Sequence, residues 1–60
     1  MSWRKTIQEV KIGDPVENNK NGKGMITDKT ERTVTVTFQN GNRVKNTYPY
    51  KDSYFWETDF

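Results

Sequence analysis

The sequence contains no cysteine, no histidine, no leucine and no alanine. Without cysteine or histidine, the chain has no disulfide, no thiol nucleophile and no imidazole to act as a general base or a zinc ligand. Without leucine or alanine, it lacks two of the strongest helix-forming residues. Apolar residues make up only 30% of the sixty positions. These absences favour one small domain with a modest core and little helix.

Threonine, valine and aromatic residues are abundant instead, and these are typical of strands. Residues 33–38, Thr-Val-Thr-Val-Thr-Phe, alternate strictly between polar and apolar side chains. That period of two predicts a half-buried antiparallel strand. Asn40 and Gly41 follow and predict a type I′ hairpin turn, because both central residues of that turn need positive φ. We expect the returning strand over residues 43–48.

Three further strands are expected at 16–18, 25–29 and 54–56, with polar or glycine-containing turns between them. Residues 50–53 are predicted to form one short 3-10 turn before the last strand. Five short strands joined by tight turns predict a small all-β barrel, because full or partial closure hides the edges of so short a sheet. We expect seven apolar side chains to fill its interior. They are Val16, Ile26, Val34, Val36, Phe38, Val44 and Phe55.

Residues 1–11 are predicted to be an N-terminal arm or helical turn, and residues 12–60 a single barrel domain. Trp3, Ile7 and Val10 are four and three residues apart, which would place them on one face of a helical turn. We expect this turn to lay Trp3 against the barrel.

The ten basic and eight acidic residues give a net charge of +2, but they are unevenly distributed. Residues 1–51 carry all ten basic residues and five acids, a net +5, whereas residues 52–60 carry the other three acids. A basic body favours contact with nucleic acid. The candidate contacts lie in the glycine-containing loop 20–24 and on the strand after the hairpin, with Lys29 and Arg32 at neighbouring strand ends. They are Lys20, Lys23, Arg43 and Lys45. A solvated turn and a strand edge protected by lysine are the alternatives.

Five aromatic residues fall between positions 48 and 56. The core needs some of these rings, and Phe55 is expected to be buried. The rings that the core does not need are suited to docking on a protein or to stacking on a base. The candidate protein-binding residues are Tyr48, Tyr50, Tyr54 and Trp56.

No motif indicates catalysis, a cofactor or a metal site. The acids at 14 and 17, and those at 28 and 31, lie in predicted turns, where carboxylates three residues apart do not converge. A chain this short also leaves little room for a concave pocket of about 300 Å³ or more.

No run approaches the roughly twenty apolar residues that cross a bilayer, and the first residues do not form a signal peptide. We therefore expect a cytoplasmic monomer that is not an enzyme and has no small-molecule substrate and no membrane contact.

The glycines and the alternating apolar residues together form a pattern that covers about residues 12–56. It runs Gly13-Asp14-x-Val16, Gly22-x-Gly24-x-Ile26, Val34-x-Val36-x-Phe38, Gly41 and Tyr48-Pro49. This pattern resembles the small SH3-like barrels of the Tudor/KOW type. It is similar in particular to the Tudor-like C-terminal module of bacterial repair helicases and to the CarD-type domain that interacts with RNA polymerase. The resemblance implies a five-stranded barrel and a non-catalytic module that binds nucleic acid, RNA polymerase or a repair protein.

Two functional hypotheses follow. The first is a small binding module that associates with nucleic acid or with the transcription and repair machinery through its basic residues. The alternative is a protein-interaction or inhibitor module, for example a phage-encoded protein that modulates its host, which acts through exposed aromatic residues.

Overall fold

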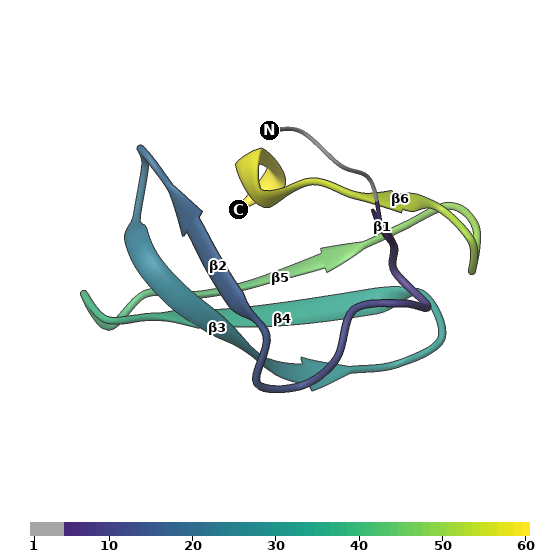
Figure 1. The fold of residues 1–60 in the computed structure, drawn as a ribbon, viewed down its shortest axis with the longest axis horizontal. Helices are drawn as coiled ribbons and strands as arrows, with labels where there is room; N and C mark the ends of the chain where they lie inside the picture. Colours follow the sequence, from purple (N-terminus) through teal and green to yellow (C-terminus); the bar gives the residue numbers. More distant parts are fainter. Residues whose placement is uncertain (1–4) are drawn as a thin grey trace.

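The computed structural model describes residues 5–60, which form six short strands and one 3-10 turn (Figure 1). The strands are β1 (Lys5–Thr6), β2 (Pro15–Asn18), β3 (Gly22–Lys29), β4 (Thr33–Phe38), β5 (Arg43–Thr47) and β6 (Tyr54–Phe55), and the 3-10 turn is η1 (Glu57–Asp59). β2, β3, β4 and β5 form one antiparallel sheet in that order, and β1 pairs with β6 in a second. The all-β class is confirmed. The two sheets are not joined into a closed barrel within the described residues, so the SH3-like barrel stays a prediction.

The β4 strand has the bounds that its alternation predicts, and its apolar residues face the core. Val34 and Val36 are completely buried, and Phe38 is nearly so. The hairpin that follows differs from the expected type I′ turn. Among residues 5–60, positive φ occurs only at glycines, so Gly41 has it and Asn40 does not. Phe38 donates its N–H to the Asn42 carbonyl at 2.8 Å and accepts the Gly41 N–H at 2.9 Å. These bonds define a three-residue loop with one left-handed glycine.

The β3 strand begins three residues earlier than expected, at Gly22, and contains a β-bulge between Ile26 and Asp28. Gly24 lies directly opposite Phe38 on β4. A Cβ atom at Gly24 would lie 2.6 Å from the Thr37 carbonyl oxygen and 2.8 Å from the Phe38 ring. Only glycine fits at this position, because β3 and β4 pack too closely there for a side chain.

Within the described residues the N-terminal segment, predicted as an arm or a helical turn, is the short strand β1 followed by a turn. Thr6 ends β1, and the Glu9 carboxylate accepts hydrogen bonds from its backbone N–H at 3.0 Å and its hydroxyl at 3.2 Å. The turn buries Ile7 and Val10, which are 1% and 3% exposed. These two residues belong to the same core cluster as the residues of β2, β3 and β4. The expected position of Trp3 lies outside the described residues.

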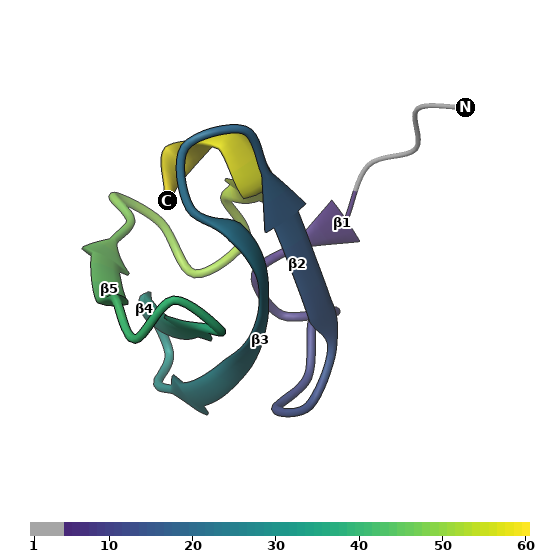
Figure 2. The ribbon, with the colours of Figure 1, turned by 90° about the vertical axis from the view of Figure 1, so that its left-hand side faces the viewer.

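The 3-10 turn lies after the last strand, and not before it as the sequence suggested. Residues 50–53 form a turn in which the Ser53 N–H donates to the Tyr50 carbonyl at 3.2 Å. After β6 the chain forms η1, which packs against β2 (Figure 2). Phe60 follows η1 and is only 1% exposed, and its ring lies 5.5 Å from that of Phe55.

The core lies between the four-stranded sheet on one side and β1, β6 and η1 on the other (Figures 1 and 2). Five of the seven residues expected in the interior are buried, while Val44 and Phe55 are partly buried and pack against them. Four further buried residues were not expected there. They are Ile7, Val10, Tyr48 and Phe60. The core therefore draws on both ends of the described chain.

Candidate nucleic-acid interface

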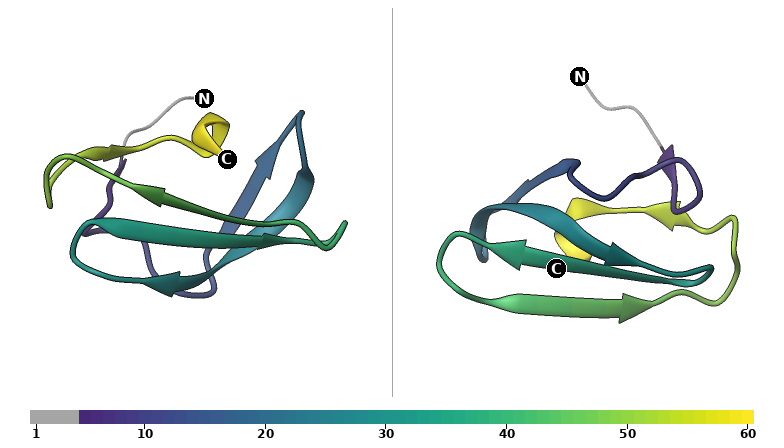
Figure 3. Two further views of the ribbon diagram at one scale, coloured as in Figure 1. Left: turned by 180° about the vertical axis from the view of Figure 1, so that it is seen from behind. Right: turned by 90° about the horizontal axis from the view of Figure 1, so that it is seen from below.

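Three of the four candidate nucleic-acid contacts lie on the outer face of the four-stranded sheet. We call the side of β3, β4 and β5 that faces away from β6 and η1 the outer face, and Figure 3 (right) views the molecule from that side. Val36 and Val44 are paired and face the core, so the neighbouring pairs Thr37–Arg43 and Thr35–Lys45 face outward. On β3, Gly24 opposes Phe38, which places Lys23 on the outer face as well. All three basic residues are exposed.

The fourth candidate, Lys20, lies in the turn between β2 and β3. The Asn18 side-chain oxygen holds this turn by accepting the backbone N–H groups of Lys20 at 3.1 Å and Asn21 at 2.8 Å. Asn40, in the β4–β5 loop, donates its side-chain amide to the Asn21 carbonyl at 3.2 Å. Asn42 donates to the Asn21 side-chain oxygen at 2.7 Å. The two loops therefore lie side by side at one end of the sheet.

This contact between loops brings Lys20, Lys23 and Arg43 to the same end of the molecule. Lys23 is the second residue of β3 and Arg43 the first of β5, so each immediately follows one of the two loops. Two strand spacings of about 4.8 Å separate β3 from β5, so the two side chains flank the end of β4. Lys45 lies further along β5 on the same face. Loop 20–24 therefore contributes cations at one end of the sheet rather than an enclosed phosphate site.

Lys29 and Arg32, which the sequence suggested as additions to this surface, are engaged elsewhere. Lys29 donates its Nζ to the carbonyls of Gln8, at 3.2 Å, and Val10, and so fastens the N-terminal turn to the end of β3. Arg32 donates to the Pro49 carbonyl at 3.4 Å. Both cations fasten chain segments to one another. We therefore assign the basic surface to Lys20, Lys23, Arg43 and Lys45, and call these four residues the basic set.

Two acids share the outer face with the basic set. Glu17 opposes Lys23 across β2 and β3, and Asp28 and Lys45 flank Thr35 on opposite sides. Glu57 and Asp59 act on the opposite side of the sheet. The Glu57 carboxylate accepts the Glu17 backbone N–H at 2.6 Å, and Asp59 accepts the Tyr48 hydroxyl at 3.4 Å. Glu57 therefore contacts β2, and Asp59 contacts Tyr48 just after β5.

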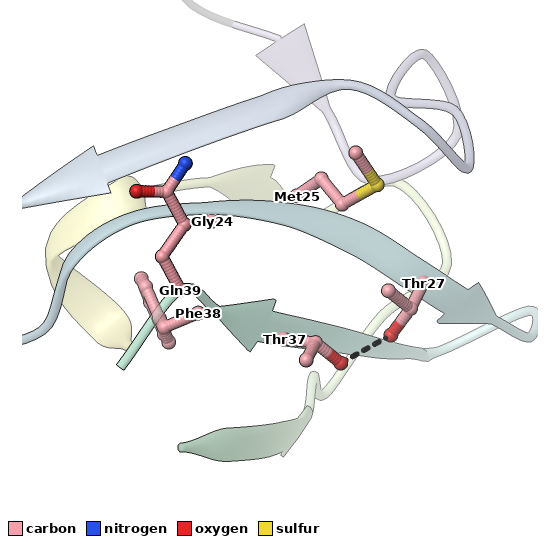
Figure 4. Close-up of a pocket in the computed structure, with 6 residues that line it drawn as sticks. All are labelled: Gly24, Met25, Thr27, Thr37, Phe38 and Gln39. Atoms are coloured by element: carbon pink, nitrogen blue, oxygen red, sulfur yellow. Dashed lines mark hydrogen bonds between the residues drawn. The ribbon is translucent and has the colours of Figure 1, made fainter. Parts of the chain in front are cut away.

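The outer face contains a hollow of about 320 Å³ beside the bulge in β3. It is lined by Gly24, Met25, Thr27, Thr37, Phe38 and Gln39. Figure 4 shows Gln39 at one end and Met25 with the paired threonines toward the other. The Thr27 and Thr37 hydroxyls are 2.9 Å apart and hydrogen-bonded. The hollow lies at the lower end of the volume range of ligand pockets and is largely open to solvent, so it is a shallow depression and not an enclosed pocket.

The aromatic candidates separate into one buried and three exposed residues. Tyr48 is only 8% exposed, so its ring is not offered to a partner and the expected docking role is wrong for it. Burial, reinforced by the charge and the hydrogen bond of Asp59, raises the pKa of Tyr48 well above its ordinary value. Tyr50, Tyr54 and Trp56 are 69%, 50% and 46% exposed. The rings of Tyr54 and Trp56 lie 6.4 Å apart at a tilt of 60°.

Within residues 5–60, no group of three or more acidic side chains is arranged to hold a metal ion. The same residues contain no helix that is long and apolar enough to span a membrane.

Comparisons with protein-family models, with curated proteins and with solved structures find no significant match. The resemblance to Tudor/KOW barrels therefore stays a prediction from the sequence pattern.

Proposed function

We propose that this protein is a small, non-catalytic module that binds nucleic acid through the basic set. The observation that supports this most is the strand register, which aligns Lys23, Arg43 and Lys45 on one face of a sheet, with Lys20 in the adjoining loop. Basic side chains spread over an exposed surface contact phosphates and give binding that depends little on sequence and strongly on salt. Such a module would associate with transcription or repair complexes through the nucleic acid that they share.

The threonines of β4 between these cations are only partly available to a phosphate. Thr35 is buried, and the hydroxyls of Thr33 and Thr37 are hydrogen-bonded to those of Thr30 and Thr27. Glu17 and Asp28 limit the positive potential, so we expect moderate affinity. Because Glu17 opposes Lys23, Glu17→Gln should raise the affinity for any oligonucleotide.

The experiment is a salt titration of oligonucleotide binding, followed by fluorescence anisotropy. Four phosphate contacts predict that log K falls with log salt at a slope of about −2.8 for a single strand, or about 50-fold between roughly 50 and 200 mM salt. The triple variant Lys23→Gln, Arg43→Gln, Lys45→Gln should reduce the slope to about −0.7. Lys51→Gln removes one exposed charge from the turn after β5 and should leave the slope unchanged. Absence of binding at low salt to DNA and RNA, single-stranded or duplex, contradicts the proposal.

A second candidate function rests on the exposure of Tyr50, Tyr54 and Trp56. Exposed aromatic rings are common anchors of protein interfaces. In this case the protein would act by docking on, or inhibiting, another protein. Recovery of one stoichiometric protein from a lysate, resistant to nuclease and to high salt and lost in Tyr50→Ala, would favour this function over nucleic-acid binding.

A further inference from the structure

The hollow beside Met25 lies between two members of the basic set. Lys23 and Met25 are two residues apart on the same face of β3, about 7 Å along the strand. Arg43 is the direct cross-strand partner of Thr37, which lines the hollow from β4. Lys23 therefore lies near the hollow on β3, and Arg43 lies near it on β5. The lining of the hollow is mainly apolar.

We infer that this hollow holds one unpaired base of a single-stranded nucleic acid, with the flanking phosphates on Lys23 and Arg43. The inference rests on the proposed function and specifies the form of nucleic acid that the outer face prefers. An apolar floor between two cations is complementary to a nucleotide, which carries an apolar ring face between anionic phosphates. An acidic peptide matches the cations but leaves the apolar floor unoccupied.

The side chains of the hollow supply contacts to both the face and the edge of a base. Met25 is 49% exposed, and its polarisable thioether packs well against aromatic rings. The Gln39 side-chain amide offers a donor and an acceptor at the other end. The hydrogen bond between Thr27 and Thr37 uses one hydroxyl hydrogen and leaves the other for a ligand. Base edges read in this way are those that a single strand exposes.

A duplex cannot fill the hollow, because its bases are stacked and paired inside the helix. Extruding one base costs a few kcal/mol, least where the strand is already single. The duplex would therefore contact only the phosphate-binding cations. The geometry predicts that a single strand binds more tightly than a duplex of the same sequence.

The test compares one labelled oligonucleotide, as DNA and as RNA, in single-stranded and duplex form at about 50 mM salt. We expect the single strand to bind about ten-fold more tightly, because only a single strand can stack one unpaired base in the hollow. Met25→Ala should weaken single-strand binding by about two- to ten-fold, leave duplex binding unchanged and leave the salt slope unchanged. Gln39→Ala should act in the same direction. Tyr50→Ala, which removes an exposed ring outside the hollow, should change neither affinity.

Equal affinity for single strand and duplex, with no effect of Met25→Ala, would overturn this inference and leave the proposed function standing. A polyglutamate peptide that binds as tightly as the oligonucleotide would also overturn it, because charge alone would then explain the affinity. The absence of binding to any nucleic acid would instead defeat the proposed function. Unchanged circular dichroism of each variant checks that its fold is intact.

Discussion

Gly24 is the residue at which the fold tolerates least change. Its missing side chain lets β3 and β4 approach each other opposite Phe38, where a Cβ atom would lie 2.6 Å from the Thr37 carbonyl oxygen and 2.9 Å from the Phe38 Cα. Both of these contacts are with backbone, so no side-chain rotation relieves them. The position is therefore set by packing between strands.

We expect Gly24→Ala to lower the free energy of unfolding by about 1–3 kcal/mol, the usual cost of overpacking. Urea denaturation monitored by circular dichroism measures this loss. The exposed neighbour Gln39→Ala serves as a control and should change stability by less than about 0.5 kcal/mol. Equal urea midpoints for Gly24→Ala and the unaltered protein would contradict the close approach of β3 and β4 at Gly24.

Glu9 makes the stability of the N-terminal turn depend on pH. Hydrogen bonds from the Thr6 backbone N–H and then the Thr6 hydroxyl, with a smaller effect of Lys5, hold the pKa of Glu9 below its ordinary value of 4.5. A carboxyl whose pKa is lowered by folding stabilises the folded state above its unfolded pKa and loses that contribution as the pH falls through its folded pKa.

We therefore expect the thermal midpoint to fall as the pH is lowered from neutral to below 4.5. Glu9→Gln keeps a side-chain acceptor for Thr6 but cannot titrate, so its midpoint should fall less over the same range. Thermal unfolding at a series of pH values compares the two proteins. Parallel pH profiles would mean that the Glu9 carboxylate does not cap this turn in solution.

At the scale of elements, the C-terminal segment after β6 completes the core and is held by asparagine side chains. Phe60 is buried against Phe55, and its carbonyl accepts the Asn21 side-chain amide at 2.5 Å. Asn18 donates to the Glu57 carbonyl at 2.9 Å, and Asn46 donates to the Asp59 carbonyl at 2.7 Å. These bonds fasten residues 57–60 to β2, to β5 and to the loop that carries Lys20.

Phe60→Ala should cost about 3–5 kcal/mol, because it leaves a cavity in a small core. A domain of this size has only a few kcal/mol of stability in total, so we expect the variant to be largely unfolded. Far-ultraviolet circular dichroism and thermal unfolding show this directly. Phe60→Leu should retain part of the stability, and Tyr50→Ala, which removes an exposed ring, should retain nearly all of it. A folded Phe60→Ala with an unchanged midpoint would contradict the burial of this residue.

The elements that could be predicted from the sequence are those with local signals. The strict alternation of residues 33–38 gives β4 its bounds, and the glycines mark the turns around β3. The type I′ hairpin was wrong because the Asn40 side chain accepts the Asn42 backbone N–H at 2.8 Å in a longer loop. Asn-Gly is compatible with both turns, and only the register of β4 and β5 decides between them.

At the scale of the whole molecule, the parts that the sequence did not predict depend on contacts between distant residues. Ile7 and Phe60 join the core from opposite ends of the described chain. The spacing of Ile7 and Val10 indicates a shared face, but no local periodicity indicates that Phe60 is buried. The asparagines are likewise typical of turns, yet Asn21 is nearly buried and connects two loops to Phe60. Alternation along the strand after the hairpin predicts that Arg43 and Lys45 share a face, whereas the position of Lys20 near them depends on those long-range bonds.

The same contacts link the fold to the proposed function. The loop that carries Lys20 is held by the β4–β5 loop and by the C-terminal segment, so loss of that segment should release Lys20 from the rest of the basic set, which the strand register holds. The exposed rings of Tyr50 and Tyr54 lie in or beside β6, in the other sheet. Nucleic-acid binding and aromatic protein docking therefore involve different surfaces.

The most direct test of the account is a nuclear magnetic resonance titration of the ¹⁵N-labelled protein with a single-stranded oligonucleotide at low salt. We expect the amide shifts to change most on the outer face and the adjoining loops, around Lys20, Lys23, Thr37 and Arg43, and little around Tyr50 and Tyr54. Raising the salt should reverse these changes. Shifts centred on Tyr50 and Tyr54, or no shifts at any oligonucleotide concentration, would contradict the assignment of the basic set as a nucleic-acid interface.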